Sequence, residues 1–200
     1  MSGAEAVTQP AGRPAGRLQT ILVLGVTAVV IAVVAYVGGG GLGKNGGVTD
    51  VTLTGSVAAS APVVGALPPG FTATTFDGKS VSLADYAGKP LWLTFGASWC
   101  PDCRTEAPDV QAAYQKYGSQ GLNVLAVFIN EPATDIAAYA GRVGLTFPIA
   151  VDEQTQIASQ YRTMGIPTHF FIGPDGRIRD VRIGALGPAD MDREIAGILH

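Results

Sequence analysis

Two cysteines carry the chemistry that this sequence offers most clearly. Cys100 and Cys103 stand in the segment Trp99-Cys100-Pro101-Asp102-Cys103, and the 200-residue chain has no other cysteine. A disulfide that closes so short a loop contributes only about 2 kcal/mol in the chain-entropy model, at the low end for disulfides. Because the pair uses every cysteine and stabilises so little, we interpret it as a dithiol that cycles between reduced and oxidised forms.

The spacing of the pair fits the first turn of a helix. If Cys100 opens a helix, Cys103 lies on the same face at i+3, and the two Cα atoms are about 5 Å apart, which a disulfide accepts. Pro101 then takes the first helical position, where its missing N–H costs nothing. Unsatisfied N–H groups and the helix dipole favour a thiolate at Cys100. We therefore predict that Cys100 is the nucleophile and Cys103 the less exposed, resolving thiol.

Other uses of two cysteines at this spacing lack their partner residues. A structural zinc site takes about four ligands, usually two cysteine pairs or cysteines with histidines. This chain has no second pair, and its only histidines are His169 and His200. Covalent haem attachment needs a histidine directly after the second cysteine, where Arg104 stands. We expect no metal and no bound cofactor besides the redox-active pair itself.

An apolar segment near the N-terminus indicates a membrane anchor. Residues 18–37 contain no charged side chain, and as a helix they would span about 30 Å, the thickness of a hydrocarbon core. A signal peptide that is cleaved to release a secreted protein is the alternative. Arg13 and Arg17 precede the segment and Lys44 follows it, a small bias that favours a cytoplasmic tail over residues 1–17. The dithiol would then lie outside the cytoplasm, where disulfides persist.

The rest of the chain divides into a linker and one domain. Residues 38–68 begin with four glycines and are rich in Gly, Val, Ser, Ala and Pro, which predicts a flexible linker, although residues 51–53 could add a short strand. Residues 69–200 are the predicted domain and carry 10 Lys and Arg against 14 Asp and Glu, a net charge of −4. An acidic domain without basic clusters argues against nucleic acid as a partner.

Hydrophobic patterning predicts alternating strands and helices in this domain. A hairpin over residues 71–83 with Asp77-Gly78 at its turn comes first, and Ser82 with Asp85 predicts a short capped turn after it. The order predicts an α/β fold with a central mixed sheet flanked by helices. The further predicted elements are strands 91–95, 122–129, 147–151, 169–172 and 178–183, a helix from the cysteines to about 117, and helices 133–143, 154–161 and 190–199.

Together these residues resemble the thioredoxin-like superfamily, and within it the membrane-tethered thiol–disulfide oxidoreductases of the TlpA/ResA/CcmG type. The resemblance covers about residues 69–199. It rests on the segment Phe95–Cys100 at the end of a strand, Cys103 at i+3, Pro108 five residues later, and Gly165-Ile166-Pro167-Thr168. It implies a thioredoxin-like fold and an enzyme that exchanges electrons with protein thiols.

The same resemblance assigns roles around the dithiol. It implies that Pro167 is a cis-proline packed against the cysteines, with a trans strand-edge proline as the alternative. The backbone of Ile166 would meet an extended substrate, as in strand addition. Trp99 and Pro101 would form walls of the site, with core packing as the alternative for Trp99. Residues 130–151 resemble the helix–strand insert that this subgroup adds to plain thioredoxins.

Three positions bear on proton transfer. Thioredoxins carry a buried Asp where this chain has Thr94. The tethered subgroup often carries Glu at the position of Glu106, which could accept or relay the proton of Cys103. The alternative for Glu106 is a solvated side chain satisfied by Arg104 or by the helix dipole. We interpret His169 as a strand residue rather than a proton donor.

The predicted function is therefore a tethered reductase of protein disulfides. The resemblance implies tasks such as the reduction of apocytochrome c cysteines, with protein thiol or disulfide substrates and a membrane electron-donor protein as partners. Two alternatives remain. One is a tethered binding or chaperone module that grips unfolded chains beside Pro167. The other is a peroxiredoxin-type peroxidase, although Leu93 and Ala97 replace the proline and threonine of that motif.

Overall fold

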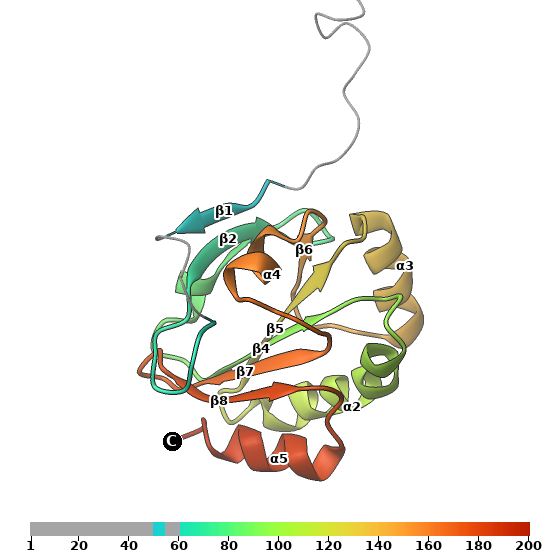
Figure 1. Ribbon diagram of the computed structural model, residues 1–200. Helices are drawn as coiled ribbons and strands as arrows, with labels where there is room; N and C mark the ends of the chain where they lie inside the picture. Colours follow the sequence, from blue (N-terminus) through green and yellow to red (C-terminus); the bar gives the residue numbers. More distant parts are fainter. Residues whose placement is uncertain (1–49, 55–60) are drawn as a thin grey trace, which may run out of the picture. The chain divides into compact units, whose positions relative to one another are not determined.

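Two sheets organise the computed structural model, which describes residues 50–54 and 61–200 (Figure 1). Strands β4, β5 and β6 of the larger sheet are parallel, whereas β7 and β8 are antiparallel to their neighbours, so the central sheet is mixed, as predicted. The smaller sheet has the order β1-β2-β3 and comprises Thr52–Thr54, Gly70–Thr74 and Ser80–Ser82. The larger sheet has the order β6-β5-β4-β7-β8, and its strands in chain order are Leu91–Gly96, Asn123–Ile129, Ile149–Asp152, Thr168–Ile172 and Ile178–Ile183.

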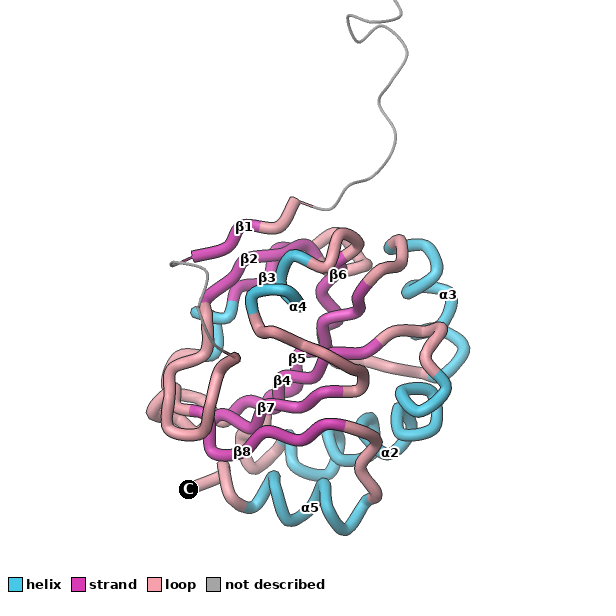
Figure 2. Tube along the Cα trace, in the orientation of Figure 1, coloured by secondary structure: helices cyan, strands magenta, loops and turns pink. Residues whose placement is uncertain are grey.

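Helices cover both faces of the larger sheet. Helices α2 and α5 lie side by side on one face, and α4 with the smaller sheet lies on the other (Figures 1 and 2). Helix α3 packs at the edge of the sheet near β6 and adds side chains to the core on the α2 side. The helices are the 3₁₀ turn η1 Leu83–Tyr86 and the α-helices α2 Pro101–Gly118, α3 Ala133–Val143, α4 Gln156–Gln160 and α5 Pro188–Ala196.

The central strand β4 separates two hydrophobic cores. Leu91, Leu93 and Phe95 pack with the smaller sheet and α4, whereas Trp92 packs with α2, α3 and α5. Successive side chains of a strand point to opposite faces, so burial on both sides requires an unbroken apolar run. This requirement explains why β4 is almost entirely apolar, with Thr94 as its one polar side chain, and this buried strand leads into the cysteines.

The N-terminal hairpin has the predicted form. Strands β2 and β3 pair in antiparallel fashion, with Ala73 opposite Val81. The Asp85 carboxylate accepts a hydrogen bond from the Ser82 N–H at 2.8 Å, and Ser82 Oγ accepts one from the Ala84 N–H at 3.3 Å. The predicted capping box is therefore present, and it starts η1.

Parts of the predicted linker are hydrogen-bonded to the domain. Strand β1 pairs with β2, with Leu53 opposite Phe71. The Gly65 N–H donates to the Ile178 carbonyl at 2.8 Å, and the Ile178 N–H donates to the Ala66 carbonyl at 3.0 Å. Strands at the edge of a sheet carry unpaired backbone groups, and these segments satisfy some of them.

The predicted tail, residues 1–17, and the predicted anchor, residues 18–37, lie outside the described residues. No helix in the part of the chain that is described is long and apolar enough to cross a membrane.

Two helices differ from their predicted bounds. The helix predicted over 154–161 is shorter, Gln156–Gln160, because Thr155 has a left-handed φ of 57° and stands before it. The helix predicted over 190–199 begins two residues earlier, at Pro188, and ends before Gly197. Proline suits the first turn of a helix, where its missing N–H is not needed. Pro188 therefore indicates the start of this helix, whereas the hydrophobic pattern alone does not.

Two glycines of α3 should respond oppositely to the same substitution. Gly141 lies inside the helix with open space around the position of a Cβ, so Gly141→Ala should raise the free energy of unfolding by about 0.5–1 kcal/mol. Gly144 ends the helix at φ 78°, so Gly144→Ala should lower the free energy of unfolding by about 1–2 kcal/mol. Urea unfolding of both variants measures the two effects, and changes of the same sign would contradict this assignment of the helix end.

Candidate active site

The two cysteines form a disulfide at the point where β4 passes into α2. Cys100 is the N-cap of α2, Pro101 follows at the start of the helix, and the Cys100 carbonyl accepts the Arg104 N–H at 3.0 Å. The Cα atoms of Cys100 and Cys103 are 5.3 Å apart, in agreement with the predicted i,i+3 placement. The strand therefore delivers the pair to its carboxyl end, as expected for chemistry on an α/β sheet.

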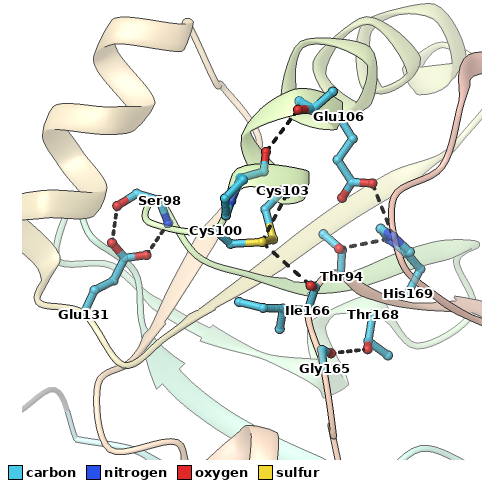
Figure 3. The surroundings of a disulfide bond; sticks show 12 residues. Thr94, Ser98, Cys100, Cys103, Glu106, Glu131, Gly165, Ile166, Thr168 and His169 are labelled. Carbon is cyan, nitrogen blue, oxygen red and sulfur yellow. Dashed lines mark hydrogen bonds and ion pairs between the residues drawn. A yellow bond between two sulfur atoms is a disulfide. The ribbon is translucent and has the colours of Figure 1, made fainter.

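The Cys100 sulfur caps the helix that follows it. The Cys103 N–H donates to Cys100 Sγ at 3.2 Å, where a Ser or Asp oxygen would usually accept (Figure 3). An anionic sulfur accepts such a bond more strongly than a neutral one, so this contact favours a Cys100 thiolate once the disulfide opens. The exposures of the two residues, 4% for Cys100 and 6% for Cys103, do not separate an attacking from a resolving thiol.

The loop before β7 forms the second wall of the site. The Ile166–Pro167 peptide bond is cis, as the resemblance implied. The Ile166 carbonyl oxygen lies 3.7 Å from Cys100 Sγ, and the Ile166 side chain packs against the cluster that Ala97 forms with the two cysteines. The Gly184 N–H donates to the Pro167 carbonyl at 2.8 Å, which ties the loop to the end of β8.

Trp99 stands at the surface next to the disulfide. It is 52% exposed, so the alternative that it packs in the core is wrong. An exposed aromatic side chain directly before the first cysteine is available to contact a substrate.

Glu106 is buried one helical turn after Cys103. It is only 5% exposed, so the alternative of a solvated side chain is wrong. Its carboxylate accepts the Leu186 N–H at 3.1 Å, and Oε2 lies 3.5 Å from His169 Nε2. Glu106 and Cys103 also line a cavity of about 20 Å³ together with Thr94, which is room for about one water molecule.

His169 is a strand residue, as predicted, and it also contacts the residues beside the disulfide. It is fully buried on β7, directly opposite Thr94 of β4. The Trp92 indole N–H donates to His169 Nδ1 at 3.2 Å, and Thr94 Oγ1 lies 3.0 Å from the same atom. The position of His169 in the sequence could have indicated this role. Side chains alternate along a strand, so the residue two positions after Pro167 points to the face that α2 covers.

A second buried carboxylate holds the loop before the cysteines. Glu131, two residues after the end of β5, is 4% exposed and accepts the Ser98 N–H at 2.6 Å and the Ser98 hydroxyl (Figure 3). Burial raises the pKa of Glu131, and the hydrogen bonds from Ser98 offset only part of that effect. No local pattern in the sequence predicts this contact, because it joins positions 33 residues apart.

The described residues offer thiol chemistry and no metal centre. Among residues 50–54 and 61–200, no three His, Cys, Asp or Glu side chains come close enough to hold a metal ion. The reactive atoms at this site are thus the two sulfurs, with one carboxylate beside Cys103 and a peptide-lined edge beside Cys100.

Comparison with known proteins places this site in a family. The model of the AhpC/TSA family matches residues 64–181. The chain belongs to that family. Its relatives include the thiol-disulfide oxidoreductase ResA of Geobacillus kaustophilus (strain HTA426), which is 35% identical over 139 residues, or 70% of this chain and 80% of the relative.

Solved structures agree with this relationship. A thiol:disulfide interchange protein described as DsbE, from Chlorobium tepidum, superposes with a TM-score of 0.65 at 29% identity and covers 70% of this chain and all of its own. StoA from Bacillus subtilis superposes with a TM-score of 0.56 at 26% identity, over 64% of this chain and 98% of its own. The protein is therefore a thioredoxin-like thiol–disulfide oxidoreductase of the ResA/CcmG type.

The raised pKa of Glu131 predicts how stability depends on pH. A carboxyl whose pKa is raised by folding stabilises the protein while protonated, and this contribution is lost as pH rises through the folded pKa. Relative to Glu131→Gln, the wild type should therefore lose free energy of unfolding as the pH rises above about 4, the ordinary carboxyl pKa, toward the raised pKa of the folded state.

A second variant sharpens this test. Ser98→Ala removes the hydroxyl donor that lowers the pKa of Glu131, so the loss should move to higher pH. Urea unfolding at several pH values measures both effects. A difference between wild type and Glu131→Gln that stays constant with pH would show that burial does not perturb this carboxyl.

Proposed function

We propose that this oxidoreductase is anchored to a membrane, faces the outside of the cytoplasm and reduces protein disulfides through Cys100 and Cys103. The observation that carries the proposal is the disulfide at the N-terminus of α2, whose Cys100 sulfur lies beside the carbonyl of Ile166. That arrangement places a backbone carbonyl beside Cys100, where an extended partner can pair, and places Cys103 beside the cavity that Glu106 lines.

The reaction consists of two exchanges. In the reduced protein the Cys100 thiolate attacks a substrate disulfide, so that a bond forms between Cys100 and one substrate sulfur and the other substrate sulfur leaves as a thiolate. Cys103 then attacks Cys100 Sγ, and the second substrate thiolate leaves. Two electrons pass to the substrate, and the protein is left with the disulfide seen here. A membrane electron-donor protein returns it to the dithiol.

Substrate contact centres on the loop before β7. An extended segment can pair with the backbone at Ile166 as an added strand, while its cysteine meets Cys100. Trp99, at 52% exposure, directly precedes Cys100, and Met164, at 92%, stands two residues before Ile166, so each supplies exposed apolar surface next to a segment that forms the site. Pro101 completes the wall at the start of α2.

Glu106 is the proposed proton acceptor for the resolving thiol. Cys103 must lose its proton before it attacks Cys100, because the thiolate is the nucleophile. Glu106 lies one turn further along α2 and shares with Cys103 a cavity that holds about one water molecule. A carboxylate placed there can take the proton directly or through that water.

Location and task rest on the N-terminal sequence and on the resemblance. Residues 18–37 would anchor the chain with residues 1–17 in the cytoplasm, or would be a signal peptide that is removed. In cytochrome c maturation, the task that the resemblance implies, the substrates would be the cysteines of apocytochrome c. The acidic domain argues for partners other than nucleic acid.

Neither alternative function gains an observation of its own. The positions of the peroxiredoxin proline and threonine hold Leu93 and Ala97, and both are fully buried apolar side chains. A binding or chaperone module would work without the cysteines, so a variant with both cysteines replaced by Ser distinguishes it from the oxidoreductase.

Replacing Cys103 should trap the substrate. In cells that express Cys103→Ala, Cys100 can form the mixed disulfide but nothing resolves it, so disulfide-linked complexes should accumulate and disappear in Cys100→Ser/Cys103→Ala. Non-reducing electrophoresis followed by mass spectrometry identifies the trapped proteins. The complexes should stay with membranes washed in alkaline carbonate, since residues 18–37 would anchor the chain.

Two results would overturn parts of this proposal. An absence of complexes through Cys100 would refute the two-cysteine mechanism, and full function in a variant with both cysteines replaced by Ser would favour the binding module. Complexes that carbonate releases would instead favour cleavage of the N-terminal segment.

The reduction potential should identify the direction of electron flow. A reductase should have a Cys100–Cys103 potential nearer to thioredoxin, at about −270 mV, than to the oxidant DsbA, at about −120 mV. Equilibration of the full chain with glutathione or dithiothreitol buffers measures this value. A potential near that of DsbA would make the protein an oxidant and contradict the proposed task.

A further inference from the structure

His169 has a buried ring nitrogen that lacks a hydrogen-bond partner. The ring is fully buried, and among the described residues Nε2 makes no hydrogen bond. The atom facing it is Glu106 Oε2, 3.5 Å away, which is within ion-pair distance but longer than a normal hydrogen bond (Figure 3). A buried polar atom without a partner costs free energy of folding, so such atoms are rare and often have a functional role.

The other ring nitrogen determines where the proton of His169 resides. The Trp92 indole N–H can only donate, and it donates to His169 Nδ1 at 3.2 Å. Nδ1 is therefore an acceptor without a proton, and Thr94 Oγ1, 3.0 Å from it, can donate to the same atom. The neutral imidazole then carries its proton on Nε2, which points to Glu106.

We propose that His169 is a positioning residue for the resolving step: held by Trp92, its Nε2–H orients the Glu106 carboxylate so that this carboxylate accepts the proton of Cys103. This inference rests on the proposed function, because it concerns the step in which Cys103 attacks. Glu106 Oε2 is also the acceptor for the Leu186 N–H, so two donors converge on one oxygen. Oε1 is left free of both.

Apart from Glu106, the charged side chain nearest to His169 along the sheet forms ion pairs with other residues. The cross-strand neighbour of His169 on β8 is Arg182, whose guanidinium pairs with Asp180 at 2.8 Å and with Glu194 of α5 at 2.7 Å. Tyr139 of α3 is a titratable side chain whose pKa is raised by burial and, to a smaller extent, by the charge of Glu106. The charge that faces Nε2 is thus that of Glu106, from α2.

The step balances without a further reagent. The Cys103 thiol gives its proton to the Glu106 carboxylate, and the resulting thiolate attacks Cys100 Sγ in the mixed disulfide. The bond between Cys100 and the substrate sulfur breaks as the Cys100–Cys103 bond forms. The substrate leaves as a thiolate and takes up a proton from Glu106 or from water, which restores the carboxylate. His169 keeps its own proton throughout.

Stopped-flow reaction of the reduced full-length chain with an aromatic disulfide that releases a coloured thiolate separates the two steps. The first release reports attack by Cys100 and the second reports resolution by Cys103. His169→Phe, which keeps a ring but loses both nitrogens, should slow the second release about tenfold near pH 7 and leave the first within about twofold. The difference should vanish above about pH 9, where the Cys103 thiol ionises without help.

Two further variants control for packing. Phe170→Leu alters the neighbouring buried residue of β7, which faces the opposite core, and should leave the pH profiles of both releases unchanged. His169→Gln, which restores an N–H donor near Nε2, should recover most of the lost rate. A purely structural role for His169 would slow both releases alike and at every pH.

The outcomes distinguish this inference from the function on which it rests. If His169→Phe retains the wild-type profile while Glu106→Gln slows the second release, the role of His169 is refuted and that of Glu106 stands. If both variants match the wild type, Glu106 is refuted too, but two releases still show exchange by two cysteines. A wild-type chain with no second release would refute the proposed mechanism itself.

A measurement on the wild type keeps the inference testable if His169→Phe does not fold. Nitrogen-15 chemical shifts of the His169 ring report which nitrogen carries the proton. The inference requires a bare Nδ1 and a protonated Nε2 near pH 7, where the releases are compared. A ring protonated on Nδ1 at that pH would overturn it.

Discussion

The junction between β4 and α2 is the constraint on which the site depends. A helix that starts inside a protein must satisfy its first N–H groups, and here the Cys100 sulfur accepts the N–H of Cys103. The reactive atom is therefore also the helix cap, so its position cannot change without loss of the first turn. Ser98, held by Glu131, fixes the chain just before this cap, and Ile166 packs against it from the opposite side.

The two faces of β4 pack against different sets of side chains, and the polar core residues of the site lie on one of these faces. Leu93 and Phe95 pack into a cluster of aliphatic and aromatic side chains, whereas Thr94 faces the α2 side together with Trp92. A buried polar group is tolerated only with a partner, and His169 supplies one to both. The contacts of His169 continue to Glu106, which lies on the same helix as Cys103 and one turn after it. The helix therefore sets the spacing between this buried carboxylate and the disulfide.

Local signals in the sequence were sufficient for the elements, but not for the contacts between them. Strand β4, the cysteine helix and the capping box at Ser82 follow from patterns within a few residues, and the structure confirms them. The pairing of Ala66 with Ile178 and of Ser98 with Glu131 joins distant segments, so no local pattern predicts them. The burial of Glu106 is likewise a contact between distant segments, because it depends on how α2 packs against β7.

Negative charge around the disulfide bears on the direction of electron flow. Figure 3 shows Glu131 and Glu106 on opposite sides of the cysteine pair, and Asp102 stands between the two cysteines in the chain. An ionised carboxylate disfavours a nearby thiolate, and a dithiol whose thiolate is less stable gives up its electrons more readily. The hydrogen bond from the Cys103 N–H and the N-terminus of α2 act in the opposite sense, because both favour a Cys100 thiolate. The reduction potential of the pair therefore depends on the balance between these acids and the start of the helix.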